Sequence, residues 1–127
     1  MTALTKVNLY GPEKLVMAIL AKVGETEINK NLAKIHEAFF YFKRDKEFSK
    51  YMKDFRFNEM GLSPFSDLLD QVLNMIENSH ILATSNPSYE TYKLNVPYLN
   101  KQFEDIAPND KENIEEMGKM LRDYVVH

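Results

Sequence analysis

The stretch that decides the fold reads SPFSDLLDQVLNMIENSHILATSNPSYETYKL, residues 63–94. Ser63 and Pro64 predict the start of a helix, with Ser63 as the N-cap and Pro64 in the first turn. Apolar residues recur at helical spacing from Leu68 to Ile76 and predict a helix that ends near Asn78. Two β-rich stretches then flank a turn cluster at residues 85–88. The stretch therefore predicts a helix followed by a β-hairpin.

The residues on either side predict more helices. Gly11-Pro12-Glu13 opens a helix that stops near Gly24, and helical periodicity returns from about residue 29 to 43. Residues 45–51 extend that helix or form a short one, and residues 55–57 form a short strand or an extended linker. An irregular stretch with Pro97 and Pro108 precedes a last helix at about residues 110–125. We therefore expect one mainly α (α+β) domain over residues 1–127, with four to five helices and a small hairpin.

The residues that carry a family resemblance are mostly of the kind that pack in a core. They are Phe55, Phe57, Gly61, Ser63, Pro64, Phe65, Ser66, Leu68, Leu69, Leu73, Ile81, Leu82, Tyr92 and Leu94. This pattern resembles winged-helix domains of small prokaryotic regulatory and phage-associated proteins, the YwgA-like group among them. The resemblance implies a winged-helix-like fold with the hairpin as the wing, and DNA binding by analogy.

The charge pattern opposes that analogy. Residues 57–92 hold five acidic residues and no Lys or Arg, whereas residues 30–56 hold eight basic and four acidic residues. The whole chain carries a formal net charge of −3. A duplex-binding domain is usually basic, because neutralising phosphates supplies most of its non-specific affinity.

The first functional hypothesis is a non-enzymatic regulator that binds duplex DNA through a basic segment. Its candidate phosphate-binding residues are Lys43, Arg44, Lys46, Lys50, Lys53 and Arg56. Acidic residues alternate with them, so a solvated surface without a ligand is the alternative.

The second hypothesis is a protein–protein interaction module whose acidic helix, at residues 65–78, docks a basic partner. The candidate residues are Asp67, Asp70, Gln71, Asn74 and Glu77. In a winged helix this element would enter the major groove, where three carboxylates would be repelled by phosphate.

Two apolar patterns point to further contacts. The last helix carries a stripe made of Ile114, Met117, Leu121 and Tyr124, which predicts either a two-fold homodimer or packing on the chain's own core. The aromatic run at residues 39–42 covers every side of a helix. One or two of its rings must therefore leave the first core layer, for a second core contact or an interface.

We predict no catalytic residues, no metal site and no cofactor. The chain has no Cys, and its four Gly residues are isolated. His36-Glu37 begins like a zinc-protease motif, but Phe40 stands where the second His is needed. No apolar run is long enough to span a membrane, so we expect no membrane partner and a cytoplasmic protein.

Overall fold

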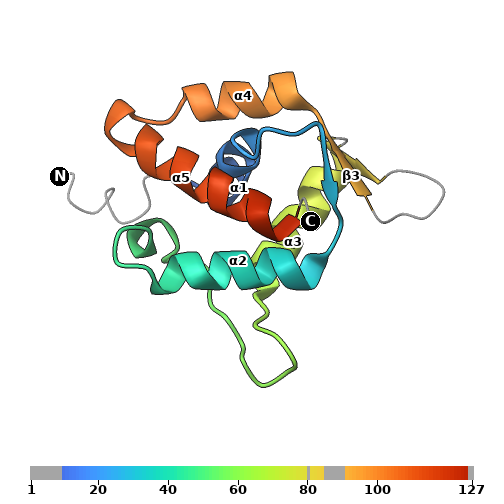
Figure 1. Cartoon of the computed structure of the whole chain (residues 1–127), viewed down its shortest axis with the longest axis vertical. Coiled ribbons are helices and arrows are strands. Elements are labelled where there is room, and N and C mark those ends of the chain that lie inside the picture. Colours follow the sequence, from blue (N-terminus) through green and yellow to red (C-terminus); the bar gives the residue numbers. More distant parts are fainter. Residues whose placement is uncertain (1–9, 80, 85–90, 126–127) are drawn as a thin grey trace.

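The computed structural model describes residues 10–79, 81–84 and 91–125. Its elements follow in the order α1 (Pro12–Ala21), β1 (Glu27–Asn29), α2 (Leu32–Arg44), the 3-10 helix η2 (Ser49–Tyr51), α3 (Asp67–Asn78), β2 (Leu82–Thr84), β3 (Thr91–Leu94), α4 (Val96–Glu104) and α5 (Pro108–Val125) (Figure 1). The fold is mainly helical with an antiparallel hairpin, so the predicted mainly α (α+β) class is confirmed, and this content is consistent with a winged-helix-like fold. None of the described helices is long and apolar enough to cross a bilayer.

Helix α1 forms the centre of the core. It packs against α3, α4 and α5, and every residue from Leu15 to Leu20 is buried. A helix at the edge of a core usually buries only one apolar face. Because neighbours contact α1 on several sides, almost the whole circumference is removed from water.

Helix α5 packs against α1 and α2 of the same chain. Ile114, Met117 and Leu121 are fully buried there, and Tyr124 is partly buried. The stripe that was expected to pair two copies is therefore occupied inside one chain. Of the two alternatives predicted for this stripe, a homodimer or packing on the chain's own core, the structure places these residues in the second, because the core of this chain already removes them from water.

The sheet contains a strand that the sequence did not predict. β1 pairs antiparallel with β3, and β3 pairs antiparallel with β2, which gives the order β1-β3-β2. Ile28 is the one buried residue of β1 and lies opposite the buried Tyr92. A three-residue strand with a single apolar position is too short to show a periodicity of its own.

The last two helices differ from the prediction. Residues 96–104, expected to be irregular, form α4, whose Asn95 side chain accepts a hydrogen bond from the Tyr98 N–H at 3.3 Å. Pro97 lies in the first turn of α4 and Pro108 begins α5, two residues before the predicted start. Proline is tolerated at these positions because the N–H that it lacks has no partner within the helix.

Helix α3 begins at Asp67, later than predicted. Its N-cap is Ser66, whose hydroxyl accepts a hydrogen bond from the Leu69 N–H at 3.2 Å, and Ser63 lies outside the helix. Residues 57–65, which we call the arm, connect the end of the η2 region to this cap.

Candidate interaction surface

The arm has a defined base. The Asn58 N–H donates to the Phe65 carbonyl at 2.7 Å, and the Phe65 N–H donates back to the Asn58 carbonyl at 3.0 Å. The Asn58 side chain also accepts from the Met60 N–H at 2.8 Å, which closes a tight turn. Figure 1 shows the chain between η2 and α3 extending away from the helical body. The arm is thus an ordered projection.

The tip of the arm is apolar and uncovered. Met60 is 93% exposed and Leu62 is 109% exposed, whereas the other exposed large hydrophobic side chains of the described residues reach at most 44%. Scattered apolar side chains on a surface are ordinary, but adjacent ones on an ordered projection indicate a contact site. The sequence did not predict this tip. The feature of the sequence that could have indicated it is the pair Met60 and Leu62 on either side of Gly61, in a stretch without helical or strand periodicity.

The arm is attached to α2 by aromatic contacts. The Phe65 ring stacks on His36 with the ring centroids 4.5 Å apart, and Phe57 meets Phe40 edge to face at 5.5 Å. The Ser66 N–H donates to His36 Nδ1 at 3.0 Å. These contacts fix both ends of the arm to one helix.

His36 is buried and electrically neutral in this arrangement. Burial lowers its pKa, and the opposing effect of the nearby Asp70 carboxylate is smaller. Nδ1 accepts the Ser66 N–H, so the ring proton lies on Nε2, which has no hydrogen-bond partner among the described residues. The sequence placed His36 at the surface or partly buried. Throughout the described ranges, no group of three or more acidic or histidine side chains is arranged to hold a metal.

The three carboxylates of α3 differ in their surroundings. Asp67 is exposed, Asp70 is half-buried, and Glu77 pairs with Lys30 at 3.5 Å. Lys30 lies in the connection between β1 and α2. It therefore neutralises part of the acidic stretch of residues 57–92, which contains no Lys or Arg. Burial and the Glu77 carboxylate raise the pKa of Tyr92 to about 12.

The outer face of α3 is consequently less acidic than the sequence indicated. Asp67, Gln71 and Asn74 are exposed along it, together with Met75, which the sequence analysis did not select. These residues lie three and four positions apart and so share one side of the helix. The face joins the arm at Asp67 and offers one free carboxylate, two amides and an apolar side chain.

The basic segment of residues 43–56 lies at the other end of α2. Arg44, Lys46, Lys50, Lys53 and Arg56 are exposed, while Lys43 is half-buried and donates to the Phe55 carbonyl. The ion pairs found in the described part of the chain include none of these six side chains. Strand β1 lies just before the start of α2, and the basic segment begins at the end of α2. The two ends of α2 are about 20 Å apart, the length of a 13-residue helix (Figure 1).

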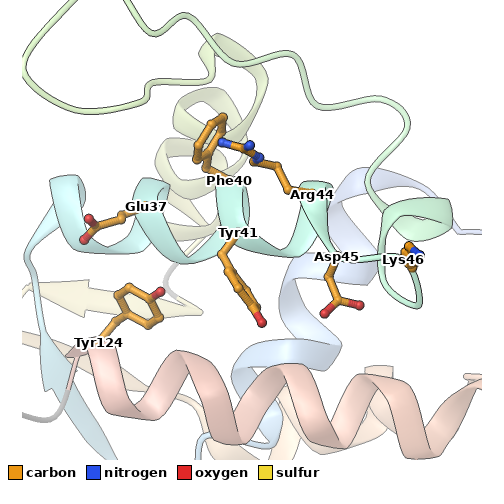
Figure 2. Close-up of a pocket in the computed structure, with 7 residues that line it drawn as sticks. All are labelled: Glu37, Phe40, Tyr41, Arg44, Asp45, Lys46 and Tyr124. Atoms are coloured by element: carbon orange, nitrogen blue, oxygen red, sulfur yellow. The ribbon is translucent and has the colours of Figure 1, made fainter.

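A cleft of about 580 Å³ separates the outer sides of α2 and α5. Figure 2 shows Tyr41 and Tyr124 in the space between the helices, with Glu37 and Asp45 on either side of Tyr41 along α2. The Asp45 carboxylate already accepts the N–H groups of Glu47 and Phe48. Two acidic and two basic residues line this cleft, so it presents no net charge for a ligand to recognise.

A polar cluster near the start of α5 is structural. The Asp110 carboxylate accepts hydrogen bonds from Tyr10 at 2.7 Å and from Tyr51 at 2.6 Å. Burial and this carboxylate raise the pKa of Tyr51 to about 12. The cluster connects Tyr10, two residues before α1, with η2 and α5, and both oxygens of the Asp110 carboxylate accept a hydrogen bond.

No protein-family model, curated protein or solved structure matches the chain. The arm and the outer face of α3 therefore have to be interpreted from their own geometry.

Proposed function

We propose that this chain is a non-enzymatic protein-interaction module that binds through the arm and the outer face of α3. The observation that carries the proposal is the exposure of Met60 and Leu62 on a projection whose backbone is already ordered. Because the backbone is fixed at the base of the arm, binding a partner costs less conformational entropy than it would for a disordered loop.

The chemistry of α3 supports recognition of protein more than of DNA. Reading base edges requires cationic or amide side chains beside the phosphate backbone, and this helix offers Gln71 and Asn74 next to Asp67 with no Lys or Arg. Helices α2 and α3 are also separated by residues 45–66. A DNA-binding helix-turn-helix joins its two helices through a turn of about three to four residues.

DNA binding through the basic segment is the second candidate. It is favoured by the six basic side chains that no described carboxylate neutralises by an ion pair. The distance of the basic segment from the sheet, along the length of α2, weighs against DNA binding. A wing and a phosphate-binding segment that contact the same side of a duplex should form one continuous positive surface.

The decisive experiment places a photoreactive benzoylphenylalanine at position 62 of the full chain, and in a control protein at position 119. Lys119 is exposed on α5 and outside the proposed surface. Irradiation in a lysate of the source cells should give a discrete protein adduct from position 62 and none from position 119. Met60→Ser in the same protein should remove the adduct, because it takes away the neighbouring apolar contact.

Two outcomes would contradict the proposal. One is the absence of any adduct from position 62. The other is binding of a random duplex that weakens steeply with salt and is lost in Lys46→Glu and Lys50→Glu, which would establish the second candidate instead.

A further inference from the structure

We infer that the arm's partner is a second copy of this chain, held in a two-fold dimer through the arm tip. The inference rests on the proposed function, since it names the partner of the same surface. It follows from the apolar tip, from a hollow at the base of the arm, and from the charges that accompany each of them.

The hollow lies beside the arm and has a volume of about 390 Å³. Phe40, Lys43, Arg44, Phe57 and Glu59 line it. Phe40 and Phe57 meet edge to face there, and Arg44 lies over the Phe40 ring at 5.4 Å. Phe40 and Arg44 also line the α2–α5 cleft, so the hollow adjoins that cleft, and Figure 2 shows both side chains on the side of α2 that faces away from α5.

The tip and the hollow are complementary in polarity and in charge. The tip presents Met60 and Leu62 next to the carboxylate of Glu59. The hollow presents two aromatic rings and the cations of Arg44 and Lys43, and Glu59 of the same chain is its single carboxylate, so its lining carries a net positive charge. An apolar side chain entering the hollow would bring Glu59 of one copy towards Arg44 of the other. No ion pair of the described residues uses either side chain within one chain.

The two features can satisfy each other only between copies. Phe57 and Glu59 belong both to the arm and to the lining of the hollow, so the tip of the arm and the hollow lie on the same face of the molecule. A two-fold axis through that face makes each tip meet the partner's hollow, and so forms the same contact twice. An unrelated basic partner would meet Glu59 favourably but would face Arg44 and Lys43 across the same surface.

Because the contact involves only the arm tip and the hollow of each copy, we expect a weak dimer that dissociates in the micromolar range. Sedimentation velocity of the full chain, from low to high micromolar concentration, should show a reversible monomer–dimer equilibrium. Leu62→Ser should raise the dissociation constant by about tenfold or more, because the side chain loses its burial in both halves of the dimer. Leu32→Ser, at an exposed leucine on α2, is the matched control and should leave the equilibrium unchanged.

Exchanging the charges of Arg44 and Glu59 tests whether these two side chains pair between the copies. Arg44→Glu and Glu59→Lys should each be monomeric alone, because both symmetric contacts then join like charges. An equimolar mixture of the two variants should dimerise again, because each of its two contacts joins opposite charges. Both side chains changed in these variants are exposed and line the hollow, so circular dichroism should report unchanged folding.

Three results would overturn the inference. They are a wild type that stays monomeric at high micromolar concentration, a dimer insensitive to Leu62→Ser, and a mixture of the charge variants that stays monomeric. If the chain is monomeric but position 62 still crosslinks to a different protein, this inference fails and the proposed function stands. If the chain is monomeric and position 62 gives no adduct, both fail.

Discussion

At the scale of single residues, His36 has its protonation state set by its contacts. Its Nδ1 accepts the Ser66 N–H, and its ring is buried beneath Phe65. A proton on Nδ1 would point towards that N–H and break the bond. Burial also disfavours the charged ring, and both effects agree with a pKa below the ordinary value of 6.5.

The pH dependence of stability follows from this lowered pKa. The unfolded chain takes up a proton at His36 near pH 6.5 while the folded chain does not, so the free energy of unfolding should fall as the pH drops below that value. The slope from this residue is limited to about 1.4 kcal/mol per pH unit. Urea unfolding between about pH 7.5 and about pH 5.5 measures it. His36→Gln retains the other two histidines and should reduce the slope, whereas an unchanged slope would show that folding does not lower the pKa of His36.

At the scale of elements, side-chain caps decide where the helices start. Asn31, Ser66 and Asn95 each accept a backbone N–H from the residue three positions later, at the starts of α2, α3 and α4. Ser63 and Ser66 are both compatible with a cap by residue type. The arm decides between them, because Phe65 pairs with Asn58 and therefore lies outside the helix, which leaves Ser66 as the cap.

The cap of α3 can be tested by comparing two serine substitutions. Ser66→Ala should lower the free energy of unfolding by about 1 kcal/mol, because the Leu69 N–H loses its acceptor at a buried position. Ser63→Ala should change it by less than about 0.5 kcal/mol, as expected for a residue outside the helix. Thermal and urea unfolding measure both. Equal effects would show that the helix starts earlier than Asp67.

At the scale of the whole molecule, the close approach of α1 and α5 fixes how the helices assemble. Gly118 faces α1 at the point of contact. A Cβ there would lie 2.5 Å from Lys22 Cβ, 2.8 Å from the Lys22 carbonyl carbon and 2.9 Å from the Ile19 oxygen. These atoms belong to the backbone or its first side-chain carbon, so they can give way only if α1 moves. The same contact places the α5 stripe in the core.

Gly118→Ala should therefore destabilise the fold. Alanine is the better helix former by about 1 kcal/mol, but forcing two packed helices apart costs about 1–3 kcal/mol or more, so the net effect should be a loss. Gly61→Ala is the control, because a Cβ in the arm would meet nothing closer than 3.9 Å. Unfolding measured by circular dichroism compares them. A stabilised Gly118→Ala protein would contradict this packing.

Helical periodicity and capping chemistry allowed most of the fold to be predicted. The helix over residues 67–78 and the β2–β3 hairpin follow from local signals, namely a stripe of apolar residues and two β-rich stretches around a turn cluster. β1 and α4 were missed, because one has a single buried position and the other contains a proline in its first turn. Among the candidate sites, the sequence allowed the exposure of Asp67 and of most of the basic segment to be anticipated. It did not allow the projecting arm, with its exposed apolar tip, to be anticipated.

The amino-acid sequence by itself determined the helical α+β class, the charge imbalance between residues 30–56 and 57–92, and which side chains are apolar. These properties depend on residue type and on spacing along the chain. Only the tertiary structure decided that the α5 stripe is buried in its own core, that Lys30 neutralises Glu77, and that Met60 and Leu62 stand uncovered beside a hollow. Each of these depends on contacts between residues distant in sequence, and an apolar side chain carries no local sign of whether another element will cover it.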